Sequence, residues 1–371
     1  MLAKGQTVVS IMEELAPKHY AVPDDKIGLQ LGSLRKEIRK VLVALDVTEQ
    51  VVEEAVGIGA DLIIAHHAII FRPLSHLQTD TPAGRLYAEL IKQDIAVYIA
   101  HTNLDVADGG INDMMAQAIG LSGLQSLEDI HTEKLKKLVV FVPATHHELV
   151  QQAVFTAGAG SIGRYSSCSF NIEGTGTFLP QEGTDPFIGQ VGQLSKVPEI
   201  RLETVVPESL EKRVVAAMLK AHPYEEVAYD LYPMDLKGRT FGLGRVGKLA
   251  EETTLAQLAD TVKLAYSVPS LRVVGELSRP VRKVAVLGGS GGRYVRHALF
   301  AGADVLITGD VDYHTAQDAL AAGLAIIDPG HNVEKIMKAE VAEFLNRKLR
   351  EKRWDTVAVP SDVDTEVFRF V

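Results

Sequence analysis

Two adjacent histidines, His66 and His67, directly follow an apolar run from Leu62 to Ala65. A short apolar run rich in β-branched residues predicts a buried strand. In open α/β sheets, ligands bind at the carboxyl ends of the parallel strands. Two neutral imidazoles at such an end can hold a divalent metal ion. The alternative is that one imidazole caps the loop and the other fills a half-buried position.

Two further segments have the same arrangement of an apolar run followed by a histidine and a carboxylate. His101 and Asp105 follow one such run, and His331 and Glu334 follow another. Because His331 and Glu334 are three residues apart, they would share one face of a helical turn. The predicted set of metal ligands is therefore His66, His67, Asp105, His331 and Glu334.

This set contains nitrogen and oxygen donors but no sulfur. Such a set suits Zn, Mn, Fe or Ni, and it does not suit a structural cysteine site. Five protein ligands exceed what one open tetrahedral catalytic site needs, and they fit two metal ions that share a carboxylate. We expect Asp105 to supply an oxygen that can bridge the two ions.

The combination of these motifs resembles a known family, the Nif3-like dinuclear metal proteins. The matching stretches are Ala65-His66-His67, His101 to Asp105, Gly309-Asp310 with Tyr313-His314, and Gly330-His331 with Glu334. Many members of that family are labelled GTP cyclohydrolase 1 type 2 homologues. The sequence differs from the family pattern at Asp24-Asp25-Lys26-Ile27, where members often carry Trp-Asp-Asn.

The resemblance implies a site and an assembly. By position, the five predicted ligands match the metal ligands of the family, and His101 matches a histidine beside the site. The resemblance also implies a toroidal homohexamer of two stacked trimers, with inserted domains over the ring openings. For a hydrolase, His101 or His314 would act as the general acid or base.

Composition limits the class of protein. The chain has 371 residues, of which 46% are hydrophobic and 23% charged, as in a soluble globular protein. The net charge of −10 argues against a broad nucleic-acid or anionic-membrane surface. A single cysteine, Cys168, rules out a disulfide within the chain and favours the cytosol. No apolar run approaches the roughly 20 residues that span a bilayer, and no signal peptide is apparent.

The order of the predicted elements indicates three domains. Strands alternate with helices before about residue 124 and after Gly247, which predicts mainly parallel sheets covered on both faces. Between them, the predicted order β-α-β-β-α-β is the ferredoxin-like signature. We predict an α/β fold with a Nif3-like two-lobed core (1–127 and 241–371) and an inserted ferredoxin-like domain (128–240). The insert resembles the PII/CutA-like domain of a subset of the family.

Several local predictions can be tested directly. Asp24 to Gly32 is predicted as a loop, Thr145 as the cap of a helix from His146 to Thr156, and Glu334 as the start of a long helix to Arg350. The loop from Gly288 to Gly292 does not fit G-x-G-x-x-G, so it either contacts a substrate phosphate or forms a tight structural turn.

Two segments of the insert carry the resemblance to the PII/CutA-like domain, and one of them has an open interpretation. Gly174 to Phe178 and His222 to Glu226 match the PII/CutA-like insert. His222 to Glu226 is polar and turn-like, and it either forms a ligand or interface loop or only connects a helix to a strand.

Two functions remain open from the sequence. The first is a dinuclear metal-dependent hydrolase that acts on a nucleotide such as GTP, as the family label suggests. The second is a non-catalytic metal-handling or regulatory protein with the insert as its sensor domain. The chain has more potential metal-ligating side chains than one closed site needs, which favours the enzyme. The inserted module favours regulation.

Overall fold

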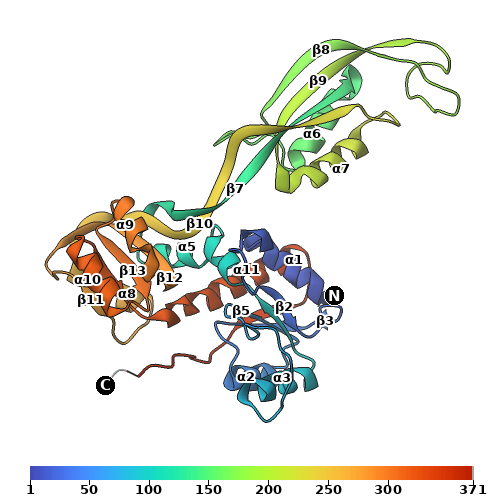
Figure 1. The fold of residues 1–371 in the computed structure, drawn as a ribbon. Helices are drawn as coiled ribbons and strands as arrows, with labels where there is room; N and C mark the ends of the chain where they lie inside the picture. Colours follow the sequence, from blue (N-terminus) through green and yellow to red (C-terminus); the bar gives the residue numbers. More distant parts are fainter. Residues whose placement is uncertain (370–371) are drawn as a thin grey trace. The chain divides into compact units, whose positions relative to one another are not determined.

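The computed structural model describes residues 1–369, and these form two compact units. Unit 1 contains Met1–His131 and the chain from Phe241 onward, and unit 2 contains Thr132–Thr240. Both lobes predicted for the α/β core therefore lie in unit 1. Figure 1 shows the chain coloured along its sequence. Within the described residues, none of the helices is long and apolar enough to cross a bilayer.

The first part of unit 1 is a five-stranded sheet in the order β15-β4-β5-β6-β2. The four strands β15, β4, β5 and β6 are parallel, and β2 joins the edge antiparallel to β6. The elements of this part are β1 (Ala3–Lys4), α1 (Gly5–Leu15), β2 (Gly28–Leu31), β3 (Glu37–Ile38), β4 (Lys40–Ala44), α2 (Glu49–Ile58), β5 (Leu62–Ala65), α3 (Pro82–Lys92), β6 (Ala96–Ile99), α4 (Thr102–Val106), α5 (Ile111–Ala118) and β15 (Val357–Pro360).

The second part of unit 1 contains the strands β11-β14-β13-β12-β10-β7 of a larger sheet. Strands β12, β13 and β14 are parallel, whereas β11 and β10 pair antiparallel with their neighbours. The elements of this part are β7 (Ser122–Pro143), β10 (Tyr229–Thr254), α8 (Leu255–Ala265), β11 (Arg272–Val274), β12 (Pro280–Ser290), α9 (Val295–Phe300), β13 (Val305–Gly309), α10 (Tyr313–Ala321), β14 (Ala325–Asp328) and α11 (Met337–Glu351).

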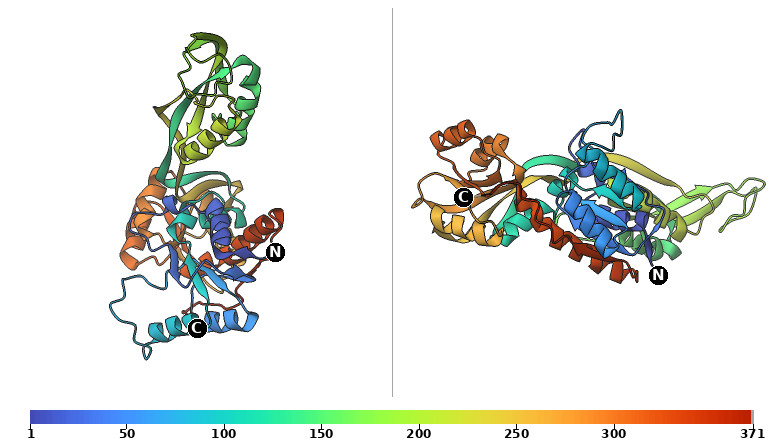
Figure 2. Two further views of the ribbon diagram at one scale, coloured as in Figure 1. Left: turned by 90° about the vertical axis from the view of Figure 1, so that its right-hand side faces the viewer. Right: turned by 90° about the horizontal axis from the view of Figure 1, so that it is seen from below.

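One shared core joins the two sheets of unit 1. Because side chains alternate between the faces of a strand, Val43 and Ile64 of the first sheet and Val286 and Ile307 of the second all enter this core. Helices α1, α5, α8 and α11 supply the rest of it, and α1 (blue) lies against α11 (red) in Figures 1 and 2. The opposite faces pack separately, with α2 and α3 on the first sheet and α9 and α10 on the second.

Local sequence sets the helix boundaries in unit 1. The Thr48 hydroxyl accepts a hydrogen bond from the Val51 amide at the start of α2, and α2 ends at Gly59 in the left-handed conformation. Thr81 caps α3 in the same way ahead of Pro82. Thr254 opens α8 with a capping box. Such caps are worth roughly 1 kcal/mol each.

Unit 2 follows the element order β7-α6-β8-β9-α7-β10, and its strands lie in the order β10-β7-β9-β8. Its apolar core combines the β7 residues Leu138 and Val140 with Leu202 of β9, Val154 of α6 and Met218 of α7. The additional elements are α6 (His147–Thr156), β8 (Ser169–Phe178), β9 (Ser195–Pro207) and α7 (Glu211–Ala221).

Three local predictions are wrong. Part of the loop predicted around Gly28 forms the edge strand β2, because its backbone groups pair with β6. Thr145 does not cap α6, since its hydroxyl bonds the Nδ1 atom of the adjacent His146. Glu334 lies in a short 3-10 helix, His331–Ile336, and α11 begins after it at Met337.

Candidate metal centre

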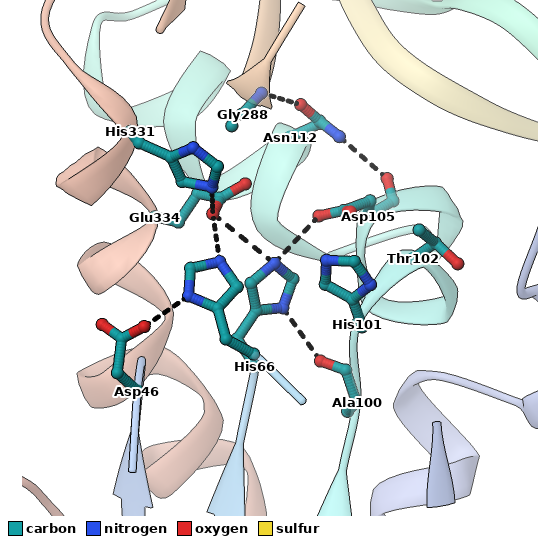
Figure 3. A network of polar contacts seen from close by, with 12 residues as sticks. Asp46, His66, Ala100, His101, Thr102, Asp105, Asn112, Gly288, His331 and Glu334 are labelled. Atoms are coloured by element: carbon teal, nitrogen blue, oxygen red, sulfur yellow. Dashed lines mark hydrogen bonds and ion pairs between the residues drawn. The ribbon is translucent and has the colours of Figure 1, made fainter. Parts of the chain in front are cut away.

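Parallel strand ends bring the predicted ligands of unit 1 together. The pairing of Ala44 with Ala65 and of Ala65 with Ile99 aligns the ends of β4, β5 and β6. The residues that follow these strands therefore emerge at one edge of the sheet. The ends of β13 and β14 deliver their own following residues to the same place, as Figure 3 shows for His331 and Glu334 beside His66.

One carboxylate oxygen, Oε2 of Glu334, lies among three imidazoles. It is 3.1 Å from Nε2 of His67, 3.3 Å from Nε2 of His331 and 3.6 Å from Nε2 of His66. Asp105 approaches from the other side, with Oδ1 3.7 Å from Nε2 of His66. All five predicted ligands are thus brought together.

The ligand atoms form two groups that share Glu334. One group is His67, His331 and Glu334, and the other is His66, Asp105 and Glu334; within each group the ligand atoms lie within 4.8 Å of one another. The shared carboxylate is therefore Glu334, whereas the sequence suggested Asp105. Asp105 takes part in only one of these groups because it lies on α4, beside His66.

Each imidazole is held through its Nδ1 atom. Nδ1 of His67 lies 2.7 Å from Oδ1 of Asp46, Nδ1 of His331 lies 2.6 Å from Oδ2 of Asp310, and Nδ1 of His66 lies 2.9 Å from the carbonyl of Ala100. Acceptors at these positions assign the ring proton to Nδ1 and leave the lone pair on Nε2. This arrangement of an acceptor behind a ligating histidine is a general feature of metal sites.

Two buried polar atoms at the centre have no hydrogen-bond partner. They are Nε2 of His66 and Oδ1 of Asp105. His66 is fully buried, and Glu334 is 3% exposed. Buried polar atoms are nearly always satisfied by a partner, and here both atoms face the shared carboxylate. The residues therefore fit divalent metal ions.

The charge of the cluster supports the same fit. Five carboxylates, those of Asp25, Asp46, Asp105, Asp310 and Glu334, surround the histidine rings. If all are ionised and the rings neutral, the side chains carry five negative charges in a largely buried space. Two divalent cations would offset four of these charges. They would thereby reduce the repulsion between the buried carboxylates.

The pKa values of the cluster follow from these contacts. Burial disfavours the imidazolium form of His67, but bonds to Asp46 and Glu334 outweigh it and raise its pKa to about 10. Glu334 also raises the pKa of His331, to about 9. Although burial opposes it, the neighbouring histidines hold the pKa of Glu334 well below its usual range. Burial raises the pKa of Asp105. The negative charge that favours a proton on Nε2 also favours a metal ion there.

Backbone features let the loops approach the cluster closely. A Cβ atom at Gly309 would lie 2.8 Å from the backbone nitrogen of His331, so only glycine permits that approach. A Cβ atom at Gly288 would lie 2.9 Å from Oε1 of Glu334. The glycine at the carboxyl end of β12 therefore makes room for the shared carboxylate. Asp310, which holds His331, has a left-handed φ of 57° and is among the residue types that tolerate it.

The two predicted acid–base histidines are placed differently. His101 lies beside the cluster, and its ligand atom falls within 4.8 Å of those of His66 and His67. Its Nδ1 atom lies 2.9 Å from Oδ1 of Asp25, and the Oδ2 atom of the same carboxylate accepts hydrogen bonds from the Thr102 amide and hydroxyl. His314 is exposed at the start of α10 and contacts the ring of Tyr313. It belongs to none of the ligand groups found among the described residues.

Sequence reasoning missed Asp46 and Asp25 as functional residues. Asp46 is the second residue after the strand β4, as His67 is after β5, so its strand-end position was a usable signal. Asp25 gave a weaker signal, because its segment was read only as a loop that departs from a family pattern.

The chain is similar to one protein family along almost its whole length. The model of one family, Duf34/NIF3 (NGG1p interacting factor 3), matches residues 3–366. Proteins named GTP cyclohydrolase 1 type 2 homolog from Halalkalibacterium halodurans and Bacillus subtilis are 55% and 52% identical; the alignments cover 100% and 99% of this chain and 100% and 98% of theirs.

Solved structures show the same similarity. A Bacillus cereus protein related to NIF3 aligns over 100% of both chains with a TM-score of 0.95 and 52% identity. The Staphylococcus aureus protein SA1388 aligns with a TM-score of 0.77 and 28% identity over 100% of this chain and 99% of its own.

Proposed function

The chain belongs to the Duf34/NIF3 family, and on that basis we propose that it is a dinuclear metal-dependent hydrolase acting on a nucleotide. The observation that carries the proposal is the position of Glu334 Oε2, within 3.1–3.6 Å of Nε2 atoms on three histidines. Glu334 would therefore be a ligand common to two ions. His67 and His331 would hold one ion with Glu334, and His66 and Asp105 would hold the other.

Two bound divalent ions would lower the pKa of a water molecule and stabilise negative charge on a substrate phosphate or carbonyl oxygen. The donor atoms do not select one metal among Zn, Fe, Mn and Ni, because imidazole and carboxylate ligands suit all four.

His101 is the residue we propose to move a proton in the reaction. Asp25 holds its Nδ1 atom, so Nε2 is the atom left to accept or donate a proton beside the cluster. The bonds from the Thr102 amide and hydroxyl fix the carboxylate of Asp25 in turn. His314 is the second predicted acid–base residue, and its exposed position ranks it after His101.

The nucleotide assignment rests on the relatives. Those from Halalkalibacterium halodurans and Bacillus subtilis are named GTP cyclohydrolase 1 type 2 homologs. We propose GTP as the first substrate to test, with other purine and pyrimidine nucleotides beside it.

The test is a substrate screen resolved by metal. Protein stripped of metal and reloaded separately with Zn, Mn, Fe(II) or Ni is incubated with each nucleotide, and products are separated by ion-exchange chromatography and identified by mass spectrometry. We expect turnover with at least one metal. His101→Gln should lower it by about 100-fold while the metal content is retained, and His314→Gln should lower it less. Protein that holds two ions per chain and hydrolyses no nucleotide would contradict the hydrolase.

A metal-handling or regulatory role is the second candidate, and one observation favours it. Unit 2 has its own apolar core and a cavity of about 710 Å³ that lies entirely within it. We propose that unit 2 is a PII-like module that acts as the sensor in this alternative. Its element order β-α-β-β-α-β supports the assignment.

We also propose that the protein assembles as a homohexamer of two stacked trimers. Similarity to the family supports this assembly. Multi-angle light scattering at micromolar concentrations should give six times the chain mass of 40.2 kDa. A monomer mass across that range would contradict the hexamer.

A further inference from the structure

Unit 2 contains a cavity of about 710 Å³ that is separate from the metal centre. This volume is within the usual range of small-molecule sites, roughly 300–1,000 Å³. Two segments that resemble the PII/CutA-like domain, Gly174–Phe178 and His222–Glu226, both contribute residues to its lining. Segments far apart in the sequence therefore converge on one space.

The carboxylate of Glu199 is the buried polar group of this cavity. Glu199 is 8% exposed and accepts a hydrogen bond of 2.8 Å from the hydroxyl of Tyr224. Burial and the neighbouring carboxylate raise the pKa of Tyr224, so its hydroxyl remains a donor. That bond uses one carboxylate oxygen, Oε1, and Oε2 points toward Gly176.

Gly176 makes the space that this carboxylate needs. A Cβ atom at position 176 would lie 2.1 Å from Oε2 of Glu199 and 2.3 Å from its Cδ. No side chain larger than hydrogen fits at this distance without displacing the acid. The glycine in the β8 segment thus keeps Glu199 at the cavity wall.

Aromatic rings form much of the remaining wall. The rings of Phe178 and Phe187 have their centroids 5.7 Å and 6.4 Å from that of Tyr224. Phe187 is 51% exposed, so part of its ring surface remains open to a ligand. Aromatic faces beside a carboxylate attract organic cations through the ring quadrupole and through charge.

Most of the charged residues that line the cavity are acidic, like Glu199. Glu173, Glu199, Glu225 and Glu226 line the cavity, against one basic residue, Arg201. The Nη2 atom of Arg201 is paired with Glu203 at 2.8 Å, and its buried Nε atom has no hydrogen-bond partner. Acidic groups therefore dominate the lining, which disfavours anionic ligands such as phosphates and carboxylates.

We propose that this cavity binds a small organic cation, an amine or ammonium compound with an aromatic or aliphatic body. Its charged nitrogen would lie against Glu199, and its apolar body would lie between Phe178, Phe187 and Tyr224. The site is independent of the metal centre, and it gives unit 2 a ligand chemistry of its own.

Three probes that differ mainly in charge test this proposal. Tryptamine is a cation, tryptophol is its neutral alcohol and indole-3-acetate is the anion, so all three share one aromatic body. Binding to the full-length protein is measured by saturation-transfer NMR and by isothermal titration. Tryptamine should bind more tightly than tryptophol, and indole-3-acetate should bind weakest.

Two variants and a control locate the binding. Glu199→Gln retains an acceptor for Tyr224 and removes the charge, so it should weaken tryptamine binding by about tenfold and leave tryptophol unchanged. Phe187→Ala, at an exposed position where folding tolerates truncation, should weaken all three probes. Glu148→Gln makes the same chemical change at an exposed position of α6 outside the lining and should change nothing.

The proposal is overturned by any of three results. These are failure of all three probes to bind the wild type, equal or preferred binding of indole-3-acetate, and full tryptamine affinity in both Glu199→Gln and Phe187→Ala. Circular dichroism and light scattering of each variant confirm that it keeps the wild-type fold and mass. None of these measurements depends on metal content or nucleotide hydrolysis.

Discussion

Asp46 holds His67 from behind: its Oδ1 atom lies 2.7 Å from the Nδ1 atom of the imidazole, and the Nε2 atom of that ring lies 3.1 Å from Oε2 of Glu334. Asp46 contacts no other member of the ligand groups among the described pairs. Its carboxylate also accepts a hydrogen bond from the Thr365 hydroxyl. It therefore fixes the ring orientation of a predicted ligand and belongs to none of the ligand groups among the described residues.

Asp46→Asn should consequently lower metal affinity by about 10- to 100-fold, as removal of such supporting carboxylates generally does. The fold should be preserved, because the residue is half-buried at a strand end. Titration of metal-stripped protein with Zn²⁺ against a competing chelator measures the effect. Asp318→Asn, an exposed position on α10, is the control. Wild-type affinity in Asp46→Asn would show that the contact has no role in metal binding.

The glycine-rich segment Gly288–Gly292, at and just after the end of β12, gives a steric prediction. Gly288→Ala would place a methyl group 2.9 Å from Oε1 of Glu334, so the shared carboxylate must move. We expect reduced metal content by elemental analysis with little change in circular dichroism. Gly292→Ala in the same loop meets Thr315 at an ordinary 3.4 Å and should retain the wild-type content. If both variants bind metal equally, the loop is only a structural turn.

Breaking a buried ion pair of unit 1 should be strongly destabilising. Nε of Arg245 lies 2.7 Å from Oδ1 of Asp113, and Nη2 lies 2.9 Å from Oδ2. Asp113→Ala leaves the guanidinium uncompensated and should lower the free energy of unfolding by about 3–5 kcal/mol. Asp108→Ala removes a longer contact of 3.7 Å with a more exposed carboxylate and should cost below about 1 kcal/mol. Chemical denaturation that gives equal losses would contradict this assignment.

Unit 2 should fold without the rest of the chain. Its core of Leu138, Val140, Val154, Leu202 and Met218 is formed within the unit. A fragment of residues 128–240 should therefore unfold cooperatively on heating and give a dispersed NMR spectrum. Absence of both would refute an independent domain.

The same fragment should lose stability in mild acid through His222. Nε2 of this ring bonds the Phe141 carbonyl at 3.0 Å, and Nδ1 accepts a bond of 3.1 Å from the Tyr224 amide, so the neutral ring satisfies both neighbours. Burial lowers its pKa, and the Phe141 carbonyl and Glu199 offset this only in part.

A lowered pKa in the folded state gives stability above the unfolded value, about 6.5. This stability is lost as the pH falls through the folded value. The melting temperature of the fragment should therefore fall from pH 7.5 to pH 5, and it should fall less in His222→Gln. Equal slopes for the two proteins would exclude His222 as the cause.

Local patterns were sufficient for much of the fold because they depend on nearby residues. The strand β5 has the bounds of its apolar run, Leu62–Ala65, and the local cap residues Thr48 and Thr81 begin α2 and α3. The edge strand β2 was missed because its pairing with β6 is a long-range contact that Gly28 and Gly32 conceal in the sequence. The 3-10 turn at Glu334 was missed for a similar reason, since the packing of that turn sets its geometry.

In the candidate site, too, the local features were predictable from the sequence and the distances between remote residues were not. Strand-end positions identified His66, His67 and His331, because the end of a parallel strand is a local property of the sequence. Which carboxylate is shared is a distance between elements far apart in the chain. Only the structure shows that Glu334 Oε2, rather than Asp105, lies among three rings.

Elemental analysis of purified, metal-loaded wild-type protein tests the central claim most directly. The account predicts about two divalent ions per chain, falling toward one or none in His67→Ala, with unchanged circular dichroism and oligomer mass. Protein that holds no divalent ion after loading, or a His67→Ala variant that keeps the full content, would contradict the dinuclear centre.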